Sequence, residues 1–208
     1  MTRTKAPRGL LRGCVLVLAL AAGAIASGCA PVVVGGTMVG GAMVYSDRRT
    51  SGTQLEDQNI ELKAGAALGP IAERGHVSVT SYNRVVLITG EVPQEADRVA
   101  AEQAIARIEN VRGTVNELAV MGASSLTSRS NDAILLGKVK AAEINAADLQ
   151  SNAIKVVVDR GNVYLMGRVT EREANRTTEL ARGVDGVHKV IRVFEILTEA
   201  ELAALQPK

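Results

Sequence analysis

The chain has 208 residues, with 24 basic and 22 acidic side chains and only 2% aromatic residues. Residues 1–28 hold four of the bases and no acid, so the remainder has 20 bases against 22 acids and is slightly acidic. Such a body lacks the basic patch and stacking rings of nucleic-acid-binding proteins. The two cysteines stand at positions 14 and 29, which leaves the rest of the chain without a thiol or a disulfide.

Residues 1–28 have the order of a bacterial export signal: a basic head, a short apolar run and a stretch of small residues. The last four positions up to Cys29, Ala-Ser-Gly-Cys, resemble the lipobox of bacterial lipoproteins. The resemblance implies cleavage before Cys29 and acylation, with palmitate among the acyl chains. Ala30 stands where aspartate would mark retention at the inner membrane, so the resemblance implies an outer-membrane lipoprotein on the periplasmic side. The alternative is an ordinary signal peptide with a chance cysteine.

Residues 29–52 form a glycine-rich linker that becomes polar toward its end. Its apolar part, residues 31–44, is too short to cross a membrane as a helix, which takes about 20 residues. Gly36 and Gly40 have the spacing that lets helices approach closely in a membrane. We nevertheless favour a flexible or membrane-apposed tether, which as a coil of ~25 residues would reach roughly 25–30 Å.

Two segments beyond the linker repeat one pattern. Residues 76–92 and 154–169 each contain an alternating strand, a polar turn and a second apolar strand. The turns, Asn83–Arg84 and residues 160–162, are short enough for β-hairpins. The repetition predicts two copies of one structural unit.

A helix and a closing strand are expected after each hairpin. Gly90 and Gly167 are placed where the strand turns into the helix, and Val-x-Gly triplets at 111–113 and 184–186 precede the closing strands. The glycine interval is 23 positions in the first copy and 19 in the second. We therefore expect the first of these helices to be longer by about one turn.

A further helix is predicted before each hairpin, over residues 54–68 and 131–147. Helix starts are marked by side chains that accept hydrogen bonds from the first turn, or by proline. In chain order these are Thr53 with Glu56, Pro93, Asn131 or Asp132, and Thr170 with Glu173. Each unit is thus helix–strand–strand–helix–strand, and a domain of about 70 residues without disulfides is marginal, so packing of the two units would help.

The cores VTSYNRVVLITGEVP and VVVDRGNVYLMGRVTEREA resemble the BON domain. Two such domains after a lipobox and a short linker are similar to the dual-BON-domain outer-membrane lipoproteins. We place the domains at residues 53–122 and 126–197, with a tail at 198–208. The resemblance implies an α+β fold, with a three-stranded sheet and two helices on one face of it in each domain. It also implies phospholipid binding in support of cell-envelope integrity.

Catalytic chemistry finds little support in the sequence. His76 and His188 are the only histidines, and they fall in different repeats. Carboxylates such as Glu171 and Glu173 are expected on solvated helix faces. No metal-ligand spacing, phosphate-binding loop or nucleophile motif is present. We predict no enzyme activity, no metal and no cofactor.

The helix over residues 131–147 carries the most informative surface. The stripe expected to face the core is Leu135, Val139, Ala142 and Ala146. The residues predicted to bind phospholipid are Ile134, Leu136, Lys138 and Lys140. Aliphatic side chains enter the membrane interface while ammonium groups meet anionic lipid phosphates. The alternative is that Ile134 and Leu136 pack against the other domain.

The two domains differ in net charge. Residues 53–122 carry 6 bases and 10 acids, whereas residues 126–197 carry 11 bases and 9 acids. The helix over residues 54–68 contains several acids and is expected to be repelled by an anionic membrane. A second hypothesis for the function is a periplasmic protein-interaction scaffold, in which the same apolar patch docks an envelope enzyme or assembly factor.

Overall fold

The computed structural model describes residues 47–205, so Cys29 and most of the linker lie outside the described residues. The first unit contains α3 (Ser51–Ala72), β1 (His76–Tyr82), β2 (Val85–Val92), α4 (Glu95–Ala106), β3 (Gly113–Asn116) and β4 (Ala119–Val120). The second contains α5 (Leu126–Asn145), the 3₁₀ turn η1 (Ser151–Ala153), β5 (Ile154–Asp159), β6 (Asn162–Thr170), α6 (Glu171–Arg182) and β7 (Lys189–Leu197). A last helix, α7 (Glu199–Leu205), follows.

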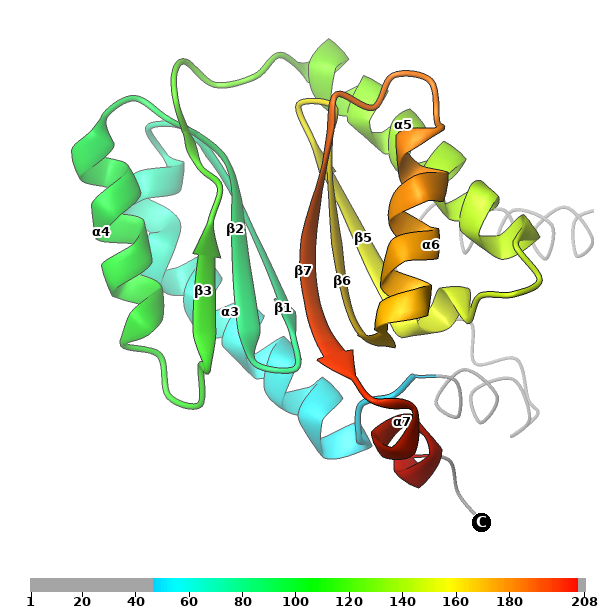
Figure 1. The fold of residues 1–208 in the computed structure, drawn as a ribbon. Coiled ribbons are helices and arrows are strands. Elements are labelled where there is room, and N and C mark those ends of the chain that lie inside the picture. The colour runs from blue at the N-terminus through cyan, green and yellow to red at the C-terminus, as the bar shows by residue number, and fades with distance from the viewer. Residues whose placement is uncertain (1–46, 206–208) are drawn as a thin grey trace, which may run out of the picture. The chain divides into compact units, whose positions relative to one another are not determined.

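Each unit has the predicted order helix–strand–strand–helix–strand, and the α+β fold class is confirmed. The second strand is central: it pairs antiparallel with the strand before it and parallel with the closing strand. The closing strand of the first unit is interrupted, and β3 and β4 both pair with β2. In Figure 1, α3 and α4 cover one face of the first sheet, and α5 and α6 cover one face of the second.

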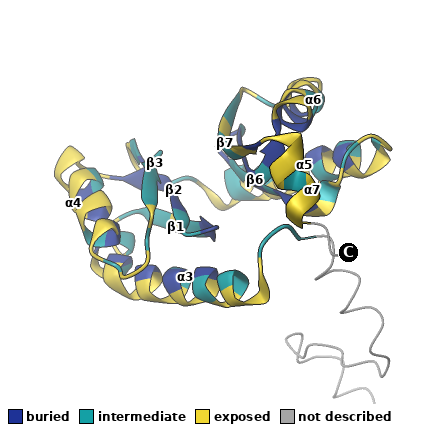
Figure 2. Cartoon of the chain, turned by 60° about the horizontal axis from the view of Figure 1, so that its bottom comes forward, coloured by how far each residue is buried: buried dark blue, intermediate teal, exposed yellow. Residues whose placement is uncertain are grey.

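Alternation along the central strands builds a core in each domain. Val86 and Ile88 of β2 point toward α3 and α4, and Val163 and Leu165 of β6 pack in the core under α5 and α6. The helices α3, α4, α5 and α6 each bury one side against the strands and leave the other in solvent, as the dark blue and yellow sides in Figure 2 show.

The residues between these positions face the other way and form a third cluster. Leu87 of β2 packs with Tyr164 and Met166 of β6, together with Tyr82 at the end of β1. Both faces of each sheet are therefore apolar, one covered by the domain's own helices and the other by the second sheet. This interdomain cluster supplies the mutual support that two small domains without disulfides need.

Both hairpins turn through two residues with positive φ. These are Asn83–Arg84 (50° and 66°) and Arg160–Gly161 (51° and 72°), the backbone of a type I′ turn. A carboxylate of each first helix holds the turn: Asp57 accepts the N–H groups of both residues of the first turn at 2.8 and 2.7 Å. Asp132 accepts those of the second turn at 2.9 and 2.8 Å. Asp132 is thus not the helix N-cap that the sequence suggested.

The starts of three helices differ from the prediction. The N-caps of α3 and α5 are Thr50 and Ser125, several residues before the predicted starts, and each side chain accepts an N–H three residues on. Pro93 precedes the N-cap of α4 instead of occupying its first turn. The capping box of Thr170 with Glu173 is confirmed. A serine or threonine stands at several positions near the starts of α3 and α5, and local pattern alone did not choose among them.

The two second helices have equal length, so the predicted extra turn in the first domain is wrong. Both α4 and α6 contain 12 residues. The two Val-x-Gly triplets are not structurally equivalent. Val85 pairs with Gly113, whereas Asn162, the equivalent of Val85 in the second domain, pairs with Lys189. The structural counterpart of Gly186 is Asn110, and both have positive φ (100° and 67°).

Gly90 lies within β2 rather than at a strand-to-helix junction, with φ +115°. A Cβ at this position would lie 1.9 Å from the carbonyl oxygen of His76 on the neighbouring strand. The glycine is therefore required by close approach of β1, and not by a turn into α4.

The carboxylates that hold the turns give a stability prediction. Asp57 is 2% exposed and also accepts the Ser81 hydroxyl, so Asp57→Ala leaves several buried donors unpaired. We expect it to lower the free energy of unfolding by about 3 kcal/mol or more, and Asp132→Ala by about 1–2 kcal/mol. Urea denaturation of the two variants measures both losses. The exposed Asp148→Ala serves as control, and losses no larger than the control's would contradict this role.

Candidate functional site

The four residues predicted from the sequence divide between two sides of α5. Ile134 is 60% exposed and lines a depression of about 580 Å³ together with the exposed Lys138. Leu136 and Lys140 line a different depression, beside Tyr82 and β5. The structure therefore brings Ile134 and Lys138 together and separates them from the other pair.

Lys140 is engaged within the second domain. Its ammonium donates to the carboxylate of Glu143 at 2.9 Å and to the carbonyl oxygens of Ser151 and Ile154 at 3.0 Å each. Glu143 is fully buried on the inner side of α5, at a place between the predicted core positions Ala142 and Ala146, which are only partly buried. Burial raises the pKa of Glu143, and the Lys140 ammonium opposes that rise. Lys140 thus neutralises an internal carboxylate and has little freedom to meet an external anion.

Leu136 is half-buried and packs against the core of the second domain. Leu135 and Val139 are buried as predicted. Of the two surplus aliphatic residues, Ile134 alone points outward. Leu136 thus packs against the core of its own domain, whereas the alternative drawn from the sequence was packing of both residues against the other domain.

Two exposed aliphatic residues of α5 were missed by sequence reasoning. Leu126 is 79% exposed and Ile144 is 66% exposed. On a helical wheel they fall with Ile134 and Ala141 within about 80° of one another. We call these four residues and Lys138 the α5 outer face. Leu126 lies five residues before the expected helix start, and Ile144 lies in the last turn, away from the lysines that marked the predicted site.

The α5 outer face is nearly free of charge. Lys138 makes no ion pair or hydrogen bond within residues 47–205, while Asp132 and Glu143 are committed to the hairpin turn and to Lys140. From Leu126 to Ile144 the face extends about 27 Å along the helix. It is a long apolar stripe with one free ammonium group on its flank.

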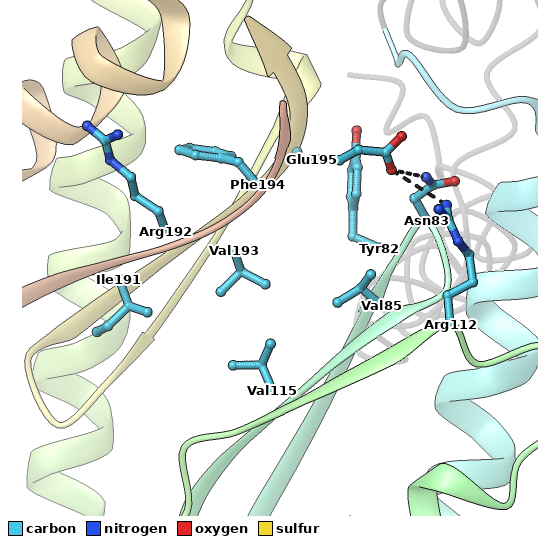
Figure 3. A pocket seen from close by; sticks show the side chains of 11 residues that line it. Tyr82, Asn83, Val85, Arg112, Val115, Ile191, Arg192, Val193, Phe194 and Glu195 are labelled. Carbon is cyan, nitrogen blue, oxygen red and sulfur yellow. Dashed lines mark hydrogen bonds and ion pairs between the residues drawn. The ribbon is translucent and has the colours of Figure 1, made fainter. Parts of the chain in front are cut away.

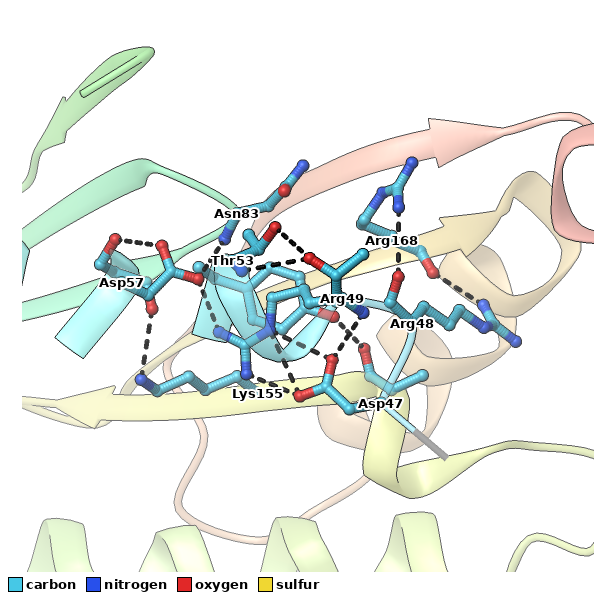
Figure 4. A network of polar contacts seen from close by, with 12 residues as sticks. Asp47, Arg48, Arg49, Thr53, Asp57, Asn83, Lys155 and Arg168 are labelled. Atoms are coloured by element: carbon cyan, nitrogen blue, oxygen red, sulfur yellow. Dashed lines mark hydrogen bonds and ion pairs between the residues drawn. The ribbon is translucent and has the colours of Figure 1, made fainter. Parts of the chain in front are cut away.

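The last linker residues connect the two domains (Figure 4). The guanidinium of Arg48 donates to both carboxylate oxygens of Glu173 at 2.7 Å and to the carbonyl of Arg168 at 2.7 Å. Arg49 binds the first domain instead: it donates to Asp57 at 2.7 Å and lies 4.1 Å from the centre of the Tyr82 ring. We call Arg48 and Arg49 with these partners the interdomain clasp.

Glu173 has a different role from the solvated surface position expected of it. It is 5% exposed, because Arg48 and the N-terminus of α6 enclose it. Burial by itself raises the pKa of Glu173, but the hydrogen bonds from Arg48 and Thr170 outweigh burial and lower the pKa below its ordinary value. Glu171 is exposed, as expected.

The described residues show neither a metal cluster nor a membrane-spanning helix. Among residues 47–205, no three histidine, cysteine or acidic side chains gather closely enough to hold a metal ion. Within the same range no helix has the length and apolar character needed to cross a membrane.

The family model "BON domain" matches residues 56–122 and 131–198. The chain belongs to the BON domain family. In this BON-domain chain α3 and α5 begin before the two matched ranges, at Ser51 and Leu126.

Three relatives span most of the chain. Outer membrane lipoprotein DolP of Haemophilus influenzae is 35% identical over 185 residues, which cover 88% of this chain and 95% of that protein. A 21 kDa hemolysin of Actinobacillus pleuropneumoniae is 29% identical and covers 71% of this chain and 78% of its own length. Osmotically-inducible protein Y of Escherichia coli is 28% identical, with 72% and 77% covered.

The clasp gives a pH-dependent prediction for this BON-domain chain. Arg48→Ala leaves the Glu173 carboxylate buried without its partner and should lower the free energy of unfolding by about 3 kcal/mol or more at neutral pH. Because the folded-state pKa of Glu173 is lowered, the stabilisation is present above its unfolded pKa and is lost as the pH falls through the folded pKa. The gap between wild type and variant should therefore shrink in acid.

Denaturation at neutral and acid pH measures this gap. Arg176→Ala is the matched control, since its partner Asp148 is half-exposed and such pairs contribute about 1 kcal/mol or less. A gap that does not change with pH would contradict the proposed link to Glu173.

Proposed function

We propose that this chain is a non-enzymatic envelope lipoprotein, anchored through Cys29 on the periplasmic side of the outer membrane, whose second domain docks on anionic phospholipid. The α5 outer face is the docking surface. The observation that carries the proposal is that Leu126, Ile134 and Ile144 are each at least 60% exposed on one side of one helix, beside a free lysine. The relative named as an outer membrane lipoprotein and the lipobox-like residues before Cys29 support the anchoring.

Burial of exposed aliphatic side chains provides the attraction. A leucine or isoleucine side chain gains about 1.5–3 kcal/mol when it leaves water completely, and each gains part of this in the interfacial region of a bilayer. Lys138 adds about 1 kcal/mol on an anionic leaflet. The summed free energy of binding is modest, but an anchored protein meets the membrane at high effective concentration and needs no strong affinity.

The corresponding helix of the first domain is a weaker candidate. Leu55 and Leu62 of α3 are 59% and 73% exposed, so the apolar component is similar. The ammonium of Lys63, however, lies 4.0 Å from the carboxylate of Glu109. The expected repulsion by acids is smaller than the sequence suggested, because Asp57 is buried against Arg49 and Glu61 pairs with Lys155 across the domains. The difference between the helices thus rests on the free cation of α5.

The interdomain clasp bears on how docking is oriented. Residues 48 and 49 hold both domains at the place where the linker reaches the body. A linker fixed at this place limits the orientations that α5 can adopt toward the membrane.

Vesicle flotation tests the docking surface. The chain from residue 29 onward, with Cys29→Ala so that it has no acyl anchor, should float with phosphatidylglycerol-containing vesicles. Flotation should decrease as ionic strength rises. Ile134→Glu or Leu126→Glu should weaken binding by about tenfold or more, because each loses apolar burial and adds a repelled charge. Lys138→Glu should act in the same direction.

Leu62→Glu on α3 is the matched control and should leave flotation unchanged. Equal binding by the Leu62 and Ile134 variants would contradict the assignment to α5. Equal binding to purely zwitterionic vesicles would contradict the role of anionic lipid. A stoichiometric protein complex that forms without lipid and is lost in Ile134→Glu would instead favour the scaffold hypothesis.

A further inference from the structure

A cleft of about 460 Å³ lies between the two sheets, on the side where the closing strands β3 and β7 form their edges. The side chains that face into it are Tyr82, Val85, Val115, Ile191 and Val193. Figure 3 shows the aliphatic groups of the two sheets facing one another across this space, while Arg192 and Phe194 point away from it. None of these residues belongs to the α5 outer face.

The cleft exists because the interdomain cluster fills the space between the sheets unevenly. The large side chains Tyr164 and Met166 occupy its centre, where they are almost fully buried. Toward the edges the packing residues are smaller, and Val115, Ile191 and Val193 are only partly buried. The result is a slot with an apolar wall on each sheet.

One end of the slot carries a charged cluster. The carboxylate of Glu195 accepts from Arg168 at 3.2 Å and from the side-chain amide of Asn83, and it lies 3.6 Å from the guanidinium of Arg112. Two guanidinium groups thus face one carboxylate. The Arg112 side chain is 52% exposed and its ion pair is long, so it can turn to a second anion while Arg168 and Asn83 keep Glu195.

We propose that this cleft binds a medium-chain fatty acid, with the hydrocarbon chain between the sheets and the carboxylate at Arg112. From Ile191 to Glu195 the wall extends about 13 Å, which suits a narrow extended chain. The walls at its middle are aliphatic on both sides and present few polar side chains, as a hydrocarbon chain requires. The net positive charge at the mouth selects an anionic head group. Ligand sites of this size and lining are common at domain interfaces.

The proposal is independent of membrane docking through α5. The chain from residue 29 onward, with Cys29→Ala, is titrated with a fluorescent fatty acid. The bound probe is then displaced by dodecanoate, decanoate or dodecanol. Dodecanoate should displace the probe, and each methylene removed should weaken displacement by about fourfold. Dodecanol should bind at least about tenfold more weakly than dodecanoate, because it lacks the charge that Arg112 receives.

Three variants make the result decisive. Val193→Trp fills the slot and should abolish binding of dodecanoate. Arg112→Ala, at a half-exposed position, should remove the preference for the acid over the alcohol. Ile134→Glu should bind the fatty acid as the parent chain does, which separates this site from the membrane-docking surface.

Several outcomes would overturn the proposal. These are failure of the parent chain to bind the probe, undiminished binding by a folded Val193→Trp variant, and an unchanged preference for dodecanoate in Arg112→Ala. If Val193→Trp does not fold, as judged by its thermal transition, the Arg112→Ala comparison alone decides. Loss of fatty-acid binding in Ile134→Glu would place the ligand on α5 and also overturn the cleft assignment.

Discussion

The structure depends on one packing constraint: each of its sheets is apolar on both faces. The helices of a domain cover only one face, and Leu87, Tyr164 and Met166 on the other faces are buried because the two sheets pack together. A single BON domain of this chain would expose that surface to water. Two domains that cover each other avoid this cost, and the clasp at Arg48 and Arg49 holds the same arrangement from the linker side.

This constraint determines which surfaces remain available for function. The inner side of α5 is used by Leu135, Val139 and the Glu143–Lys140 pair, and its Asp132 holds the neighbouring hairpin. The outer side therefore remains as the free apolar surface of that helix. The same uneven packing between the sheets leaves the slot beside Val193. Docking and ligand binding are thus assigned to surfaces that the fold itself does not use.

Local patterns predicted much of the fold, and long-range contacts account for most errors. Alternation gave the strands, and Thr170 with Glu173 gave a helix start, because both signals act within a few residues. The prediction of a longer helix in the first domain failed because it equated the two Val-x-Gly triplets, whereas the register of the closing strands depends on pairing with β2 and β6. Leu126 was missed with the helix start, and the contacts of Lys140 with Ser151 and Ile154 were not foreseen because those partners come from later elements. The Arg48–Glu173 pair joins residues 125 positions apart, which no local pattern reports.

Paramagnetic relaxation from a spin-labelled lipid tests the central claim most directly. The chain from residue 29 onward, with Cys29→Ala, is bound to phosphatidylglycerol nanodiscs that carry the label. The broadening of each amide signal is measured by NMR. Docking through the α5 outer face predicts the strongest broadening around Leu126, Ile134 and Ile144, with α3 and α4 unaffected. Strongest broadening on α3, or equal weak broadening over all residues, would contradict the account.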